Sequence, residues 1–461
     1  MRGQTADKQA LFETMPVGRA LMIMAVPTIL SQLIILIYNI ADTWFIGQTN
    51  NHYMVAASSL VATVFMMISA VACLFGTGGG NLVIRLIAEK REDEARRVSA
   101  ISLYMAGGTA IVISLLCLAF MDPLLNALGA SANTIGYARQ YMSFVIILGS
   151  LPVILSQTMS FMLRNLGYSR EAAIGMGMGG LLNVALDPLF MFVILPDGYQ
   201  VMGAAVATLL SNVATLVYFI IIYRKARRES VLEFPGRIRR VHASSMKRLF
   251  IVGLPAALSV LFYDLCNMTI NMLSATHGDA ELAAMGIVLK VERFPLNVGI
   301  GLCLAMMPLV AYNCSSGNKE RMFAFFKRAR TVGLIIAFIS VAAYFTLAPF
   351  IIQAFIADKT VVGLGAAFLQ ARCFATPLMF PSFHMVNFMQ AVEHGKIAFF
   401  LAFIRQLCLN IPILILFNYL WGMTGIIWTQ VTADFINVII SYLIYGRVKG
   451  QLAAQTGQAA G

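Results

Sequence analysis

The chain has 461 residues, of which 59% are hydrophobic and only 12% charged, whereas a soluble domain carries about 25% charged residues. This composition excludes an ordinary soluble protein. The formal net charge of +12 is spread over short loops between apolar runs, a placement that does not favour a nucleic-acid partner.

Long stretches without charge recur from residues 20–41 onward, and each is about the length that a helix needs to cross a bilayer, roughly 20 residues. The stretches are continuously apolar and lack the alternation of a membrane barrel, so helices are expected. We predict an all-α polytopic membrane protein with twelve transmembrane helices. The approximate spans are 18–46, 54–84, 98–120, 134–163, 171–194, 201–223, 249–275, 282–314, 328–356, 363–391, 397–419 and 423–446.

The loops between these spans alternate in charge. Basic residues gather in 85–97, 164–170, 224–248 and 319–330, whereas intervening turns such as 122–134 hold no Lys or Arg. This alternation is typical of the positive-inside rule and places both termini in the cytoplasm. The polar N-terminal segment lacks the features of a signal peptide. The sequence therefore predicts a multi-pass protein of the inner (plasma) membrane.

The first half of the chain is repeated in the second. The stretch AVPTILSQLIILIYNIADT resembles GLPAALSVLFYDLCNMTIN at a shift of 228 residues, which pairs Pro27 with Pro255. The shift falls to 224 where Pro188 pairs with Pro412, as loop insertions and deletions would produce. Six spans in each half give both halves one orientation, so we predict two six-helix bundles related by a pseudo-two-fold axis along the membrane normal.

The predicted domain organisation follows from this repeat. We expect a cytoplasmic N-terminus at 1–17, an N-terminal bundle at 18–223, a cytoplasmic connecting loop at 224–248, a C-terminal bundle at 249–446 and a cytoplasmic tail at 447–461. The connecting loop is expected to be ordered and to lie along the membrane surface.

Several motifs occur in a fixed order along the chain. They are YNIADTWFIG in the first span, NVALDPLF in the fifth, GAAVAT opening the sixth and VERFPLNVGIGLCLAMMPLVAYNCSSGNKERM in the second half. Together they resemble the multidrug and toxic compound extrusion (MATE) family over roughly residues 18–446. The first half is most similar to the DinF-like branch of this family, which pairs a first-span Asp with a fifth-span Asp. The resemblance implies two bundles facing a central cavity and drug export driven by inward flow of protons or sodium ions.

Two carboxylates lie inside apolar spans of the first half. Asp42 is near the outer end of its span, and Asp187 follows Glu171 by sixteen residues, roughly 24 Å along a helix. Asn39 and Asn183 precede them by three and four residues, which places each amide on the helix face of its carboxylate. Two close carboxylates disfavour each other's ionisation and can share one proton. The sequence therefore predicts a site for H⁺ or Na⁺.

Each carboxylate also has a plainer interpretation. Asp42 lies beside Trp44, a residue that favours the membrane interface, and could mark the outer end of the span. Asp187 could be a structural acid hydrogen-bonded to Asn183.

Further positions follow from the resemblance alone. Tyr38, Tyr141 and Thr208 match polar lining positions of the family. Pro27 matches the kink that is proposed to switch the family's first helix; a bend without a functional role is the alternative.

The second half departs from the first, because Ile270 and Ile411 take the places of the two acids. Its own candidates are Asp264, Glu292 with the flanking Lys290 and Arg293, Arg405 and Asp434. We predict that Glu292 and Arg405 form an ion pair within the membrane, with a second cation or substrate site as the alternative. The NorM-type branch carries a sodium carboxylate near the position of Asp264, which leaves sodium use open. His384 is predicted to be structural rather than titrating.

The remaining sequence features narrow the function. The seven cysteines show no paired spacing, which predicts packing residues rather than disulfides or a zinc site. HExxH, GxSxG and P-loop motifs are missing from the sequence, so an enzyme is not expected. We expect a monomeric antiporter without a cofactor that exports organic cations among membrane lipids. A lipid-linked oligosaccharide or lipid flippase of the same superfamily is the alternative, because Arg405, Lys290 and Arg293 could line a cationic cavity.

Overall fold

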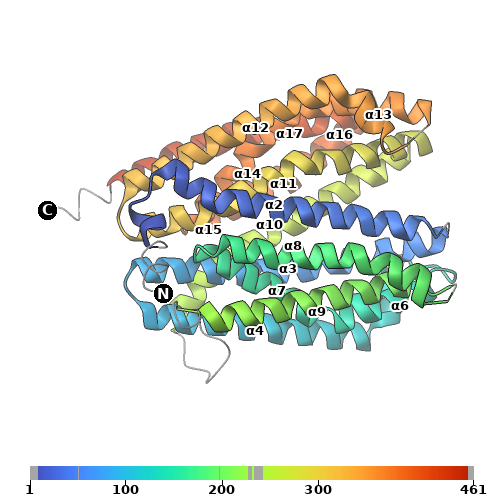
Figure 1. Cartoon of the computed structure of the whole chain (residues 1–461). Coiled ribbons are helices and arrows are strands. Elements are labelled where there is room, and N and C mark those ends of the chain that lie inside the picture. Colours follow the sequence, from blue (N-terminus) through green and yellow to red (C-terminus); the bar gives the residue numbers. More distant parts are fainter. Residues whose placement is uncertain are drawn as a thin grey trace. The chain divides into compact units, whose positions relative to one another are not determined.

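The computed structural model describes residues 9–49, 51–196, 198–226, 231–232, 242–356 and 358–454, and these residues form helices joined by short turns, without strands (Figure 1). Eleven of the described helices are long and apolar enough to cross a membrane. A twelfth span is a bent pair, Ile135–Leu148 with Ser150–Asn165, whose axes differ by 48°. The twelve helices predicted from the charge-free stretches are therefore present.

The first six spans contain helices α2 to α9. Their bounds are α2 Val17–Gly47, α3 His52–Ala88, α4 Glu92–Ala119, α5 Met121–Ala127, α6 Ile135–Met142, the π-helical η1 Ser143–Leu148, α7 Ser150–Asn165, α8 Ser169–Pro188, the π-helical η2 Leu189–Ile194 and α9 Gln200–Ala226. The last six spans contain helices α10 to α17. Their bounds are α10 Ala243–Ala275, α11 Asp279–Ser315, α12 Lys319–Gln353, α13 Lys359–Arg372, the 3₁₀ turn η3 Cys373–Ala375, α14 Thr376–Ala391, α15 Gly395–Phe403, the π-helical η4 Ile404–Asn410, α16 Ile411–Trp421 and α17 Met423–Ala454.

Several helices extend beyond the apolar stretches that predicted them. Helix α4 begins at Glu92, and three acidic residues in its first turn suit the positive end of the helix dipole. Helices α3, α12 and α13 begin after Asn51, Asn318 and Asp358, whose side chains accept hydrogen bonds from the first free backbone N–H groups. Local capping thus decides where these helices start.

The repeat is visible in the turns. In each half, the turn after the second span and the turn after the fourth span contain a residue with positive φ: Lys90 and Gly167 in the first half, Gly317 and Glu393 in the second. Corresponding positions hold the left-handed conformation whether or not the residue is glycine, for which it is easiest. The backbone plan is therefore shared more strictly than the sequence.

Contacts divide the chain into two compact units. The N-terminal unit comprises Met22–Ala257 with Met1–Met15, and the C-terminal unit comprises Leu258–Gly461 with Pro16–Leu21. The division falls inside α2 and α10, near the prolines Pro27 and Pro255 that each helix contains. Most of the predicted connecting loop 224–248 lies outside the described residues, so its expected course along the membrane surface stays a prediction.

Candidate functional site: a carboxylate pair in the N-terminal unit

Asp187 is fully buried near the end of α8. The amide of Asn183, one turn earlier, donates to Oδ1 of Asp187 at 3.1 Å and lies 3.3 Å from the hydroxyl of Thr208 on α9. The other carboxylate oxygen, Oδ2, is buried without a hydrogen-bond partner. One oxygen of the Asp187 carboxylate is therefore fixed by a hydrogen bond, and the other is left without a donor.

Asp42 approaches this group from α2. Its carboxylate is close enough to Asp187 and Tyr141 for electrostatic interaction, and Tyr141 also interacts with Tyr38. One oxygen of Asp42, Oδ1, is buried and has no partner. The structure thus brings together side chains from α2, α6, α8 and α9 that are far apart in sequence.

Glycines on α8 allow this approach. A Cβ atom on Gly180 would lie 3.0 Å from the ring of Tyr38, and one on Gly177 would lie 3.1 Å from Ile34. Both contacts are tighter than a side chain normally accepts, so the run GMGMGG gives α2 the room to pack closely against α8. The spacing of the acids therefore depends on the small residues between the two helices.

Asn39 is not hydrogen-bonded to Asp42 in this structure, and its part in the coupling site stays a prediction. Its amide donates to the backbone carbonyl of Ile35 at 2.7 Å, and the side chain is exposed. Asn183 instead supplies the amide of the cluster. The helical spacing could not distinguish the two amides, because each lies three or four residues before its carboxylate.

The cluster has an excess of hydrogen-bond acceptors. Asp42, Asp187 and Asn183 each bury one oxygen without a donor, and buried acceptors are costly unless they are satisfied. A proton on one carboxylate, or a cation held by carboxylate, amide and hydroxyl oxygens, would satisfy them. The described residues contain no cluster of three or more His, Cys, Asp or Glu side chains that fits a metal ion. A Na⁺ ion at this place would therefore need the oxygens of Asn183 and Thr208 as well.

The C-terminal unit treats its buried charges differently. Arg405 donates to both oxygens of Asp434, at 2.6 and 3.3 Å, and lies 4.4 Å from the ring centroid of Phe383. Arg372 donates to both oxygens of Glu292, at 2.9 and 3.0 Å. The predicted pair between Glu292 and Arg405 is wrong, because each residue faces a closer partner of opposite charge on another helix.

Sequence reasoning missed Arg372. It is the only charged residue between Lys359 and Glu393, so its isolation inside an apolar span was a usable signal for a buried ion pair. Asp264, a predicted candidate, is partly buried and interacts electrostatically with Arg293.

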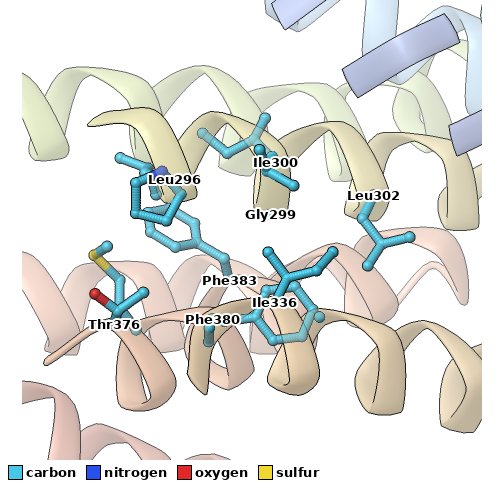
Figure 2. A pocket seen from close by; sticks show the side chains of 13 residues that line it. Leu296, Gly299, Ile300, Leu302, Ile336, Thr376, Phe380 and Phe383 are labelled. Carbon is cyan, nitrogen blue, oxygen red and sulfur yellow. The ribbon is translucent and has the colours of Figure 1, made fainter. Parts of the chain in front are cut away.

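His384 is buried between aromatic rings. It stacks on Phe326 at 4.4 Å and on Phe380 at 5.6 Å between ring centroids. Phe380 also lines an apolar cavity between α11, α12 and α14, in which Leu296, Ile336 and Phe383 point toward one another (Figure 2). This cavity lies in the C-terminal unit and has no titratable lining residue, so it is a poor candidate for ion binding.

The fold and the site define a class of membrane transporter: two helical repeats with uncompensated carboxylates inside one of them. The MatE family model matches the chain twice, at residues 27–189 and 255–416. The two matches begin 228 residues apart, which is the shift found between Pro27 and Pro255. The chain therefore belongs to the MatE family of multidrug and toxic compound extrusion transporters.

Curated relatives and solved structures agree with this family. The chain is 29% identical to the multidrug export protein MepA of Staphylococcus aureus over 450 residues, 97% of each chain. It is 29% identical to MepA of Staphylococcus haemolyticus over 442 residues, 96% of each. An outward-facing multidrug resistance MATE transporter has a similar fold, with a TM-score of 0.88, 22% identity and coverage of 97% and 98%. A MOP superfamily transporter from Pyrococcus furiosus, described as having a binding pocket of reverse polarity, is similar in fold with a TM-score of 0.87 and 21% identity. The match covers 96% of this chain and 98% of that one.

Proposed function

We propose that this protein exports lipophilic organic cations in exchange for protons, by alternating access, with Asp42 and Asp187 as the coupling site. Na⁺ is the alternative coupling ion. Family membership and the export activity named for the MepA relatives support the transport function. The observation that carries the coupling site is the set of buried acceptor oxygens without donors on Asp42, Asp187 and Asn183.

A protonatable site needs a carboxylate whose two charge states are both tolerated. Asp187 keeps its hydrogen bond from Asn183 in either state, because Oδ1 accepts while Oδ2 is available for a proton. Ionisation of both carboxylates together is disfavoured by their mutual repulsion. One proton shared by the pair therefore removes a charge from an apolar region, and its loss restores an attraction for a cationic drug.

Coupling requires that drug and proton disfavour each other's binding. In the proposed cycle the outward-facing protein loads a proton at Asp42 and Asp187, which releases the cationic drug outward. The inward-facing protein then loses the proton and binds a new drug molecule. The driving force is the inward proton gradient, and no covalent step or cofactor is involved.

Pro27 is the proposed weak point of the first span. Proline lacks an N–H group and cannot complete the helical hydrogen bond to the carbonyl four residues earlier. Next to it, the hydroxyl of Thr28 donates to the carbonyl of Met24 at 2.7 Å, and that of Ser31 donates to the carbonyl of Thr28 at 2.8 Å. Side-chain bonds of this kind bend helices. A change of charge at Asp42 would then be relieved by bending of α2 near Pro27.

The flippase alternative loses part of its basis. It relied on Arg405, Lys290 and Arg293 as a cationic lining, but Arg405 is neutralised by Asp434. We therefore keep drug export as the proposed function, in a monomer of the inner membrane with both termini cytoplasmic.

The test is transport in liposomes. Liposomes that contain the purified protein should accumulate a fluorescent lipophilic cation when a pH gradient is imposed. Liposomes that contain the Asp42→Asn, Asp187→Asn double variant should lose this dependence on the gradient. Transport driven only by a Na⁺ gradient would assign Na⁺ as the coupling ion. Undiminished, gradient-driven transport by the double variant would show that the carboxylate pair is not the coupling site.

A further inference from the structure

The first half of α10 belongs to the N-terminal unit, although this helix opens the second repeat. Contacts assign α10 up to Ala257 to the N-terminal unit and the helix from Leu258 onward to the C-terminal unit. Helix α2, its counterpart in the first repeat, is divided much earlier, because only Pro16–Leu21 are assigned to the other unit. The segment that crosses the boundary is therefore about four turns long in α10 and less than about two turns long in α2.

The beginning of α10 is bonded to the turn between α3 and α4. Arg248 donates to both oxygens of Glu89, at 2.8 and 3.4 Å, and the hydroxyl of Ser245 donates to Glu94. Arg91 joins the two acids, because it donates to Glu89 at 3.1 Å and also to Glu94. A network of charges holds its members more firmly than an isolated surface ion pair does. These five side chains therefore fix the start of α10 on the N-terminal unit.

Further along, the backbone of α10 touches the backbone of α3. A Cβ atom on Gly78 of α3 would lie 2.6 Å from the carbonyl oxygen of Leu249 and 2.9 Å from the Cα atom of Gly253. Phe75 and Phe250 also meet edge to face, with 6.4 Å between their ring centroids. Small residues allow apolar helices to pack this closely. Because backbone atoms form the contact, it contains no flexible side chain that could adapt to sliding of one helix along the other.

The corresponding positions of α2 lack both features. At the shift of 228 residues, Ala20 and Gly317 stand where α10 and the α3–α4 turn form the ion pair. Ala25 and Met306 stand where the two glycines meet. The repeat would allow both helices to be held in the same way, but only α10 has the residues that do so. This difference agrees with the longer segment of α10 that belongs to the other unit.

Pro255 follows directly after the section of α10 that is held on α3. A proline cannot complete the helical hydrogen bond to the carbonyl four residues earlier, and helices bend where such a bond is missing. The boundary between the two units falls two residues later, after Ala257. The fixed section therefore ends at the point where α10 bends most easily.

We propose that residues 243–257 of α10 move as part of the N-terminal unit throughout the transport cycle, and that α10 bends at Pro255 when the two units change their arrangement. The bonded side chains of Glu89, Glu94, Ser245 and Arg248, together with the glycine contact, form the clamp that holds this section. The inference rests on the proposed alternating access, and it identifies the place in the chain where the motion between the halves is absorbed.

Distances between spin labels test both parts of the proposal on the full-length protein in detergent. The cysteines that are not buried are first replaced by serine; they are Cys73, Cys314 and Cys408. A label at Lys247→Cys, on the clamped section, is paired with a label at Asp93→Cys on α4 or at Lys327→Cys on α12. All three positions are exposed. The distances are measured at acidic and at neutral pH, with and without tetraphenylphosphonium.

We expect the distance between positions 247 and 93 to stay the same in every condition, and the distance between positions 247 and 327 to change with pH or with the bound cation. A change in the first distance as large as that in the second would overturn the clamp. Two constant distances would overturn the hinge, because no bending would accompany the conditions that drive transport. Distances that change as expected in a protein that does not transport would reject the proposed function and leave the hinge in place.

A cross-link provides a second test. Ser245→Cys and Glu94→Cys place thiols on two side chains that are in contact, and copper phenanthroline oxidises the two thiols to a disulfide. Gradient-driven efflux by the oxidised protein should stay within about twofold of that by the reduced protein, as for a change that affects no moving contact. The wild type treated in the same way is the control for the native cysteines.

The opposite results of the cross-link are equally clear. A loss of efflux of more than about tenfold, equivalent to about 1.4 kcal/mol, that a reductant reverses would show that the two segments must separate during transport. Failure of the two thiols to form a disulfide would show that the contact is not maintained. Either result would overturn the clamp.

Discussion

The two units of this transporter are built on one repeat, yet they handle charge inside apolar helices in opposite ways. In the N-terminal unit, Asp42 and Asp187 each bury a carboxylate oxygen without a donor. In the C-terminal unit, Glu292 and Asp434 are each bonded to an arginine through both oxygens. Ile270 and Ile411 stand where the repeat would place the two acids, so the difference is a property of side chains on a common backbone.

This comparison separates two uses of a buried charge. A neutralised pair holds helices together and has one stable charge state, whereas an uncompensated carboxylate can gain or lose a proton or cation. Removing one partner of a buried ion pair strongly destabilises the folded protein, because the other charge is left buried and uncompensated. An acid whose proton compensates it should instead tolerate conversion to its neutral isostere.

The largest effect is expected for Arg405→Met. It leaves the fully buried Asp434 without its cation, so the free energy of unfolding should fall by about 3–5 kcal/mol. Denaturant unfolding in detergent measures this. The control is Arg139→Met, which breaks an exposed ion pair with Asp122 and should cost at most about 1 kcal/mol. Adding Asp434→Leu to Arg405→Met should recover part of the loss; equal stability of the two single variants would refute the contrast.

The second effect is on transport. Asp187→Asn preserves the shape of the side chain and removes the charge, so gradient-driven efflux should fall more than tenfold, equivalent to about 1.4 kcal/mol or more. Its free energy of unfolding should stay within about 1 kcal/mol of the wild type, because the buried carboxylate has no cationic partner to lose. Efflux and denaturant unfolding are measured on the same preparation. A large loss of stability with little loss of efflux would make Asp187 a structural acid.

A smaller effect is expected from the packing that brings the acids together. Gly180→Ala places a methyl group 3.0 Å from the ring of Tyr38 and should displace α2 from α8 at a cost of about 1 kcal/mol. Efflux should fall severalfold. Gly108→Ala, at a helical glycine with open space around it, is the matched control and should transport normally. Equal efflux by both variants would show that the close approach of α2 is not required.

The smallest effect concerns a compensated charge outside the spans. Burial opposes ionisation of Glu89, but hydrogen bonds from Arg248 and Arg91 and the nearby charge of Arg85 outweigh it and hold the pKa of Glu89 below its ordinary value. Its contribution to stability is therefore present above the unfolded-state pKa of about 4.3 and is lost as the pH falls through the folded-state pKa.

Glu89→Gln should accordingly lower the free energy of unfolding by less than about 1 kcal/mol at pH 7. The difference from the wild type should shrink as the pH is lowered stepwise below about 4. Unfolding curves at each pH test this. A difference that grows toward acid pH would contradict the sign of the pKa shift.

Much of the fold was predictable because the bilayer imposes simple requirements on a sequence. A span must be long, apolar and helical, so the charge-free stretches predicted the twelve helices, and the pairing of Pro27 with Pro255 predicted the register of the family match. The hydrogen bond between Asn183 and Asp187 was also predictable, because residues four positions apart on one helix are neighbours on its surface.

The partners of the charged residues were decided only by the tertiary structure. Glu292 and Arg372 are 80 residues apart, and Arg405 and Asp434 are 29 apart, so their pairing depends on how neighbouring helices are rotated and aligned. The sequence indicates how deep in the membrane each charged residue lies, but not toward which neighbouring helix its side chain points. For this reason Glu292 was predicted to pair with Arg405. Depth is a property of one helix, determined by its own residues, whereas a contact between helices depends on the packing of both.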